Sequence, residues 1–251
     1  MRIITSLNPV IFLRFISIVI LLSFSGCNGG DDTIIETGST PGPDNPRYRI
    51  FERPFSGQYT NSWPFDHDLP LGVFSSHHSE EGSSHVLTWK GQIVELTWGD
   101  GRHHDGYDWV MPEGTPLFAV AHGEVVFADR EEPFQCGSRG EKAALIVTIR
   151  HATSQQGIFE SQYTHLSRID VVEGEEVSSG QQIGLSGNTG CSSGPHLHFS
   201  VFRLIDDNRR VVIDPFGWEG SMDDPWEVFT GGVQSLWLWK KGCAPEGDYS
   251  Y

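Results

Sequence analysis

Two short segments contain the residues most able to do chemistry. In SGPHLHF, His196 and His198 are two positions apart, so on a β-strand both side chains point to one face. In HHDGYD, His104, Gly106 and Asp108 share one face if that segment is also a strand, and Gly106 leaves room for an ion. Taken alone, each segment is more typical of a polar surface than of a metal site.

Together the two segments offer the ligands of a catalytic zinc ion. Such an ion takes three nitrogen or oxygen ligands from the protein and keeps a fourth position open for water. Two imidazoles and one carboxylate leave one formal positive charge on the site, so the ion remains a strong Lewis acid. The sequence contains no CxxC pair, which argues against a thiolate site, and no HExxH, so histidine would replace glutamate as the general base.

Strands are expected to position these residues. Segments rich in β-branched and aromatic residues, bounded by Gly, Pro, Asn or Ser turns, occur at 123–128, 143–151, 159–167 and 195–203. Weaker strand candidates lie within 85–89 and 92–98. The 29 Gly and 14 Pro also favour turns and short strands over long helices. We therefore predict a mainly β fold, an antiparallel β-sheet or sandwich, with an active-site groove lined by loops.

The N-terminus indicates export. An apolar run at 15–24 has the length of a signal-peptide h-region rather than a membrane span. The run ends in SFSGC, which resembles the lipobox of bacterial lipoproteins, where Cys27 would be acylated and anchor the chain in a membrane. Residues 1–27 are therefore expected to be a lipoprotein signal peptide; an ordinary secreted protein is the alternative.

The residues after Cys27 refine this expectation. Residues 28–47 are rich in Gly, Asp, Thr and Pro and should form a flexible tether. Asn28 rather than Asp after the cysteine favours the outer membrane over the inner one. The expected location is the periplasmic face of the bacterial cell envelope.

Charge and cysteine content set further limits. The 17 Lys and Arg against 33 Asp and Glu give a net charge of -16, which repels phosphate backbones and argues against a nucleic-acid partner. An exported protein occupies a compartment where disulfides persist. If Cys27 carries lipid, Cys136, Cys191 and Cys243 remain. A Cys136–Cys191 bridge would join two loops, but sequence alone does not fix the pairing.

Five segments in order carry a family resemblance. HHDGYD, PEGTPLFAVAHGEVVFA, YTHLS, VVEGEEVSSGQQIGLSGNTG and SGPHLHF together resemble the lysostaphin-type, LytM-like zinc metalloendopeptidases, which cut peptide bridges in peptidoglycan. The resemblance covers roughly His104 to Arg203. Several separated motifs in one order are far more selective than any single motif.

The resemblance implies a role for five residues. It makes His104, Asp108 and His198 the ligands of one Zn²⁺ per chain. His165 of YTHLS and His196 then occupy the positions of the family's two non-ligand active-site histidines. Either could accept a proton or hydrogen-bond the developing oxyanion, and which one is the general base stays open.

The rest of the chain divides around this core. We expect an N-terminal extension at 48–99 packed on a zinc peptidase core at 100–203, followed by a Trp-rich C-terminal extension at 204–251. The four tryptophans of the last segment are expected to pack rather than to form a carbohydrate-binding surface. Five further histidines are expected at the surface: His77, His78, His103, His122 and His151.

The resemblance implies a lipid-anchored zinc endopeptidase that hydrolyses peptide crosslinks of peptidoglycan. The alternative is a non-enzymatic lipoprotein of the same fold that binds the cell wall or activates amidases. All five expected positions are filled, which favours the enzyme.

Overall fold

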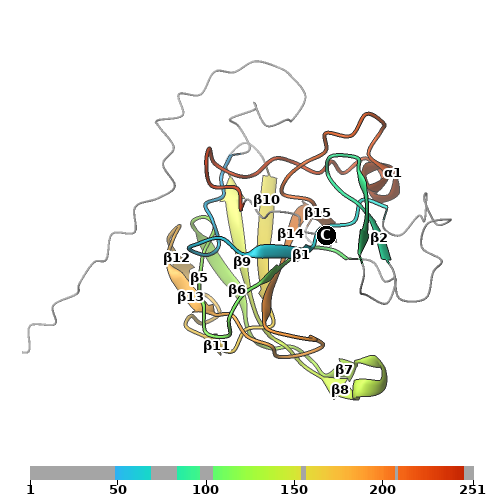
Figure 1. Ribbon diagram of the computed structural model, residues 1–251. Coiled ribbons are helices and arrows are strands. Elements are labelled where there is room, and N and C mark those ends of the chain that lie inside the picture. Colours follow the sequence, from blue (N-terminus) through green and yellow to red (C-terminus); the bar gives the residue numbers. More distant parts are fainter. Residues whose placement is uncertain (1–48, 69–83, 97–103, 154–156, 207–208, 246–251) are drawn as a thin grey trace, which may run out of the picture.

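The computed structural model describes residues 49–68, 84–96, 104–153, 157–206 and 209–245 (Figure 1). Strands predominate there and pair antiparallel in four sheets, so the predicted mainly β, antiparallel fold is confirmed. The described part of the chain contains one α-helix, α1 (Pro225–Thr230), which Asp224 caps by accepting a hydrogen bond from Trp226 N. Within those same residues, no helix has the length and apolar character needed to cross a membrane.

An eight-stranded antiparallel sheet forms the centre of the molecule (Figure 1). Its strands follow the order β1, β4, β14, β10, β9, β6, β12, and β15 also pairs with β14. The bounds are β1 (Thr60–Trp63), β4 (Tyr107–Val110), β6 (Gly123–Arg130), β9 (Leu145–Thr153), β10 (Gly157–Thr164), β12 (Glu176–Val177), β14 (His196–Asp206) and β15 (Arg209–Ile213).

Smaller sheets and hairpins surround this centre. A three-stranded sheet contains β11 (Arg168–Ile169), β13 (Gln182–Leu185) and β5 (Pro116–Phe118) in that order. One hairpin joins β2 (Ser84–Leu87) to β3 (Ile93–Leu96), and another joins β7 (Phe134–Gln135) to β8 (Glu141–Lys142). The short 3₁₀-helix at Gly137–Arg139 lies between β7 and β8, and this hairpin projects from the body of the fold (Figure 1).

Alternation along β14 separates a core face from an open face. Leu197, Phe199 and Val201 are completely buried, while His196 and His198 alternate with them on the other face. The same alternation occurs in β10, where Phe159 and Tyr163 face the core. The central sheet therefore carries the hydrophobic core on one side and the chemically active side chains on the other.

The core is closed by segments far apart in sequence. Phe51, Leu117, Ile183 and Trp239 are all fully buried in one cluster with the core face of the central sheet. The hydroxyl of Tyr163 also donates to the Phe118 carbonyl at 3.0 Å, which ties β10 to β5. Both extensions therefore contribute to the packing that fixes the central sheet.

The main strand predictions are confirmed. The four strong candidates correspond to β6, β9, β10 and β14, and the two weak ones to β2 and β3. The sequence did not reveal that β1 extends the central sheet by pairing with β4. The boundaries predicted between extensions and core remain predictions.

The tryptophans of the C-terminal segment pack as predicted. Trp226 and Trp239 are buried, and Trp237 packs against the core cluster. Trp218 lies with its ring 4.7 Å from that of His67. These contacts use the aromatic rings for stability rather than for a ligand surface.

The prediction for His151 is wrong. Its side chain is buried, and its ring nitrogens bond the Ser161 hydroxyl at 2.8 Å and the His122 carbonyl at 3.0 Å. Burial lowers the pKa of His151 to about 4, so it is a neutral core residue that ties β9 to β10. His122 is exposed, as predicted.

The predicted disulfide is present. Cys136 and Cys191 are bonded, with 5.6 Å between their Cα atoms. Other predictions fall on residues that the structure does not describe: the signal peptide at 1–27 with Cys27, the tether at 28–47, and the surface positions of His77, His78 and His103.

Candidate metal centre

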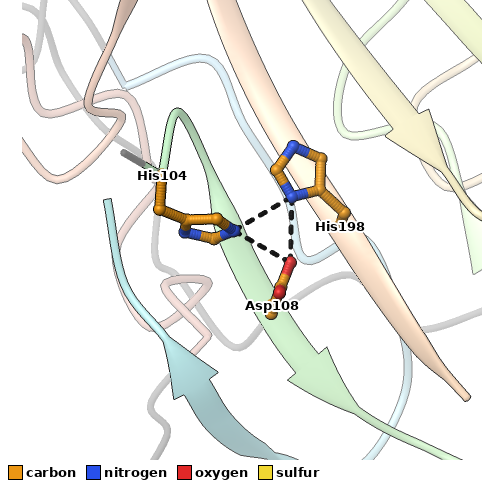
Figure 2. Close-up of side chains that lie close together, drawn as sticks. All are labelled: His104, Asp108 and His198. Carbon is orange, nitrogen blue, oxygen red and sulfur yellow. Dashed lines mark hydrogen bonds and ion pairs between the residues drawn. The ribbon is translucent and has the colours of Figure 1, made fainter. Parts of the chain in front are cut away.

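Three side chains converge where β4 meets β14 (Figure 2). Asp108 of β4 lies directly opposite His198 of β14 in the strand register. His104 lies three residues before Tyr107, the first residue of β4. The oxygen Asp108 Oδ1 is 2.9 Å from His198 Nδ1 and 3.2 Å from His104 Nε2. The two ring nitrogens are 3.1 Å apart.

These separations fit one small cation. Zinc with ligands at 2.0 to 2.1 Å in tetrahedral geometry places neighbouring ligand atoms about 3.3 Å apart. The three side chains are only 11 to 15% exposed, so the ligand atoms are held in place and largely shielded from water. His104, Asp108 and His198 can therefore hold a metal ion, as predicted.

The outer nitrogens of both rings already have acceptors. The Nδ1–H group of His104 donates to the Pro64 carbonyl at 2.9 Å, and the Nε2–H group of His198 donates to the Ser200 hydroxyl at 2.8 Å. This assignment directs the lone pairs of both inner nitrogens toward the Asp108 carboxylate. With this assignment one cation could accept all three lone pairs, and such outer hydrogen bonds are typical of histidine metal ligands.

Two groups around the centre were not found from the sequence. Asp105 Oδ1 lies 3.4 Å from His198 Nε2, on the side away from the ligand atoms. The Trp63 ring stacks on the His104 ring at 5.3 Å. Asp105 lies inside the HHDGYD segment and could have been considered as a supporting carboxylate, whereas nothing in the sequence connects Trp63 to His104 across 40 residues of chain.

The electrostatics of the centre favour positive charge. Burial alone would raise the pKa of Asp108, but His104 and His198 hold it well below its ordinary value. Burial opposes a charge on His198 too, yet Asp105 and Asp108 raise its pKa to about 10. The two carboxylates thus stabilise a cation at this point of the fold.

His165 and His196 lie next to the three ligands. Their rings are 4.6 Å apart, and His196 Nε2 is 3.5 Å from Asp108 Oδ1. The Nδ1–H group of His165 donates to the Thr189 carbonyl at 2.7 Å, and that of His196 to the Gly194 carbonyl at 2.8 Å. Each ring therefore keeps a free Nε2 lone pair.

The environment keeps His165 neutral. Burial, followed by the nearby His198 and His196, lowers its pKa to about 3. His165 also has a φ of 67°, which a residue other than glycine rarely adopts. Such strained conformations cluster at functional sites, where the surrounding structure enforces them. The structure thus brings together all five residues predicted for the site.

Glycines allow the chain to pack tightly here. A side chain at Gly106 would meet the Phe199 carbonyl at 2.5 Å and the Ser200 hydroxyl at 2.9 Å. Gly106 is therefore needed for the close approach of β14, and a side chain there would also lie 3.0 Å from the ring carbon Cε1 of His198. That Gly106 leaves room for an ion stays a prediction. A side chain at Gly187 would meet Ser167 N at 2.4 Å, so the loop after β13 can pass close to His165.

Comparisons with a family model and with solved structures find similar proteins. A family model described as "Peptidase family M23" matches residues 102–215, which contain all five site residues. The solved catalytic domain of lysostaphin from Staphylococcus simulans is 31% identical, over 45% of this chain and 77% of that domain, with a TM-score of 0.35. Residues 102–215 are a peptidase family M23 domain.

Curated relatives match less than half of the chain. Peptidoglycan DD-endopeptidase ShyA of Vibrio cholerae serotype O1 is 42% identical over 98 residues, which are 39% of this chain and 20% of ShyA. Lysostaphin from Staphylococcus simulans is 37% identical over 117 residues, 46% of this chain and 21% of its own length. The chain thus spans about a fifth of the length of these relatives.

Proposed function

We propose that this protein is a zinc-dependent endopeptidase that hydrolyses peptide crosslinks of peptidoglycan. The observation that carries the proposal is the convergence of His104, Asp108 and His198, whose lone pairs meet where a tetrahedral cation fits. Membership of family M23 and the similarity to peptidoglycan endopeptidases such as ShyA support the choice of substrate.

Each residue would have a defined part in peptide hydrolysis. His104, Asp108 and His198 would hold zinc, which when bound acidifies water and polarises a carbonyl group. His165 and His196 present Nε2 lone pairs on one side of the centre. They would accept a proton from the attacking water and pass it to the leaving amine. Partial burial of the centre strengthens these interactions by excluding bulk water.

The proposed place of action is the cell envelope. Acylation of Cys27 would anchor the chain, and the tether at 28–47 would let the domain reach the peptidoglycan. The SFSGC segment supports this part of the proposal.

Metal analysis and peptidoglycan digestion test the enzyme proposal. The purified protein is expected to bind one equivalent of zinc and to release new peptide ends from crosslinked muropeptides. His198→Ala should lose both properties. His122→Ala removes an exposed histidine that hydrogen-bonds the Val177 carbonyl outside the centre, so it serves as the matched control.

Other outcomes would contradict parts of the proposal. A wild-type protein that binds zinc but cleaves no crosslinked muropeptide would support a regulatory, non-enzymatic role instead. Full cleavage by both His165→Ala and His196→Ala would remove these histidines from the proton-transfer step while leaving the metal assignment intact.

A further inference from the structure

A positively charged hollow lies beside the metal centre. It has a volume of about 690 Å³ and lies between the β7–β8 hairpin and the loop at 188–192. Arg130, Arg139 and Lys142 line it, and Glu141 is the one carboxylate among its lining residues. The hollow thus has an excess of positive charge in a protein whose net charge is -16.

The cationic groups of this hollow have no carboxylate partner within the described residues. Arg130 Nη1 donates to the Ala143 carbonyl at 2.7 Å, and Arg139 Nη1 donates to the Ser192 carbonyl at 2.6 Å. No hydrogen bond or ion pair to the Lys142 ammonium occurs in the part of the chain that the structure describes. An anion entering the hollow would meet guanidinium and ammonium groups whose charge is uncompensated.

Another large hollow, on the open face of the central sheet, shows the contrast. It has a volume of about 640 Å³ and contains Arg150 and Arg210. Both guanidinium groups bond the carboxylate of Glu160, at 2.8 Å and 3.1 Å. The three arginines that line this hollow, Arg209 included, are balanced by three lining carboxylates, Glu131, Glu160 and Asp206, so an anion gains less there.

The cationic hollow shares a wall with the active-site histidines. Thr189 and Ser192 line the hollow. The Thr189 carbonyl accepts the Nδ1–H of His165 at 2.7 Å, and the Ser192 hydroxyl lies 3.2 Å from His196 Nδ1. A peptide with its scissile bond at the metal centre therefore has its flanking residues close to the hollow.

The two sides of the hollow are fixed to each other. The Cys136–Cys191 disulfide joins the β7–β8 hairpin to the loop at 188–192. The Arg139 guanidinium spans the same gap through the Ser192 carbonyl. A preformed site of this kind binds with little loss of conformational freedom in the protein.

We propose that this hollow is a subsite for a carboxylate of the substrate peptide, next to the scissile bond. The inference rests on the proposed function and narrows the substrate to acidic peptides. Arg130 and Lys142 would bind the carboxylate, and Arg139 would add charge while it holds the loop in place.

Paired substrates test the inference. Crosslinked muropeptide dimers are prepared with free carboxylates and with the same carboxylates converted to amides. The zinc-loaded wild-type protein is expected to cleave the free form with a kcat/KM about tenfold higher. The double variant Arg130→Gln/Lys142→Gln should reduce this preference to about twofold or less. Lys241→Gln removes an exposed charge that lines neither hollow and should keep the wild-type preference.

Binding of uncrosslinked stem peptides gives a readout that does not need cleavage. Wild-type protein should bind the free-carboxylate form about tenfold more tightly than the amide in calorimetry, and the double variant should not. Discrimination in binding without any cleavage would sink the proposed function but keep the subsite. Equal cleavage or equal binding of the two forms, or a preference that persists in the double variant, would overturn the subsite.

Discussion

The two histidines of SGPHLHF differ in what surrounds them rather than in their position on the strand. The Nε2–H group of His198 donates to the Ser200 hydroxyl, and its Nδ1 faces Asp108. The Nδ1–H group of His196 donates to the Gly194 carbonyl, which leaves the lone pair on Nε2. In the proposed function, these hydrogen bonds leave His198 Nδ1 for the metal and His196 Nε2 for proton transfer.

Asp105 is expected to strengthen metal binding through His198. Its carboxylate faces His198 Nε2 at 3.4 Å. Burial alone would raise the pKa of Asp105, but the hydrogen bond and the charge of His198 lower it to about 2. Asp105→Asn keeps the size but removes the charge, so zinc affinity should fall about tenfold in competition with a chelator. Asp170→Asn, at an exposed pair with Arg168, is the control. Unchanged affinity would mean that Ser200 alone orients the ring.

The positive φ of His165 is expected to lower the stability of the fold, and this effect can be measured apart from the role of the side chain. Its φ of 67° costs about 1 kcal/mol for any residue with a side chain, whereas glycine adopts it freely. His165→Gly should therefore be about 1 kcal/mol more stable than His165→Ala in urea unfolding, while both variants lose cleavage. Equal stability of the two variants would show that this backbone is not strained.

At the level of elements, the long strands gave a strong signal in the sequence, whereas among the short ones β2 and β3 gave a weak signal and β1, β11 and β12 gave none. β9, β10 and β14 have eight or more residues with clear apolar alternation. β1 has the sequence TNSW, whose polar residues give no strand pattern, and it forms because its partner β4 offers an open edge. Strands of two to four residues such as β11 and β12 depend on tertiary contacts, which override local propensity.

The candidate site divides in the same way. Its five central residues lie in short motifs and were found from the sequence. The Pro64 carbonyl that orients His104 acts through the backbone, so its residue type carries no signal. The burial of His151 was missed because a histidine in a strand of alternating pattern can face either side.

The disulfide is expected to hold the wall of the active site. It closes a loop with a sequence separation of 55 residues and clamps the β7–β8 hairpin to the chain that bonds His165 and His196. The double variant Cys136→Ser/Cys191→Ser should lose about 2 to 4 kcal/mol of unfolding free energy. The KM for crosslinked muropeptides should rise more than kcat falls, because the metal ligands lie on β14, on β4 and just before β4 rather than on the clamped loop. A loss of stability with unchanged KM would limit the disulfide to a structural role.

At the scale of the whole molecule, residues of both extensions hold β4, the strand that carries Asp108. His67 of the N-terminal extension bonds Asp224 at 2.8 Å and Asp214 at 3.0 Å. Tyr107, the neighbour of Asp108, donates its hydroxyl to the same Asp214 at 2.8 Å. One buried cluster thus links the segment after β1, the start of α1 and the strand β4. The position of β4, and with it Asp108, therefore depends on contacts with residues distant in the sequence.

This cluster makes the stability of the fold depend on pH. Burial alone would lower the pKa of His67, but the carboxylates of Asp214 and Asp224 outweigh it and raise the pKa from 6.5 to about 9. The charged imidazole therefore stabilises the folded state fully below about pH 6.5, and this contribution is lost as the pH rises through about 9. Its size is at most about 3 kcal/mol.

Thermal unfolding at several pH values tests this dependence. His67→Gln keeps a hydrogen-bonding side chain without a charge, so the gap in Tm between wild type and variant should be largest near pH 6 and shrink toward pH 10, values set by the two pKa values of His67. Asp224→Asn removes one of the two carboxylates that raise the pKa of His67. The variant should therefore lose stability at a lower alkaline pH than the wild type does. A gap that stays constant across this range would show that His67 is neutral in the folded protein, and the cluster would then act through hydrogen bonds alone.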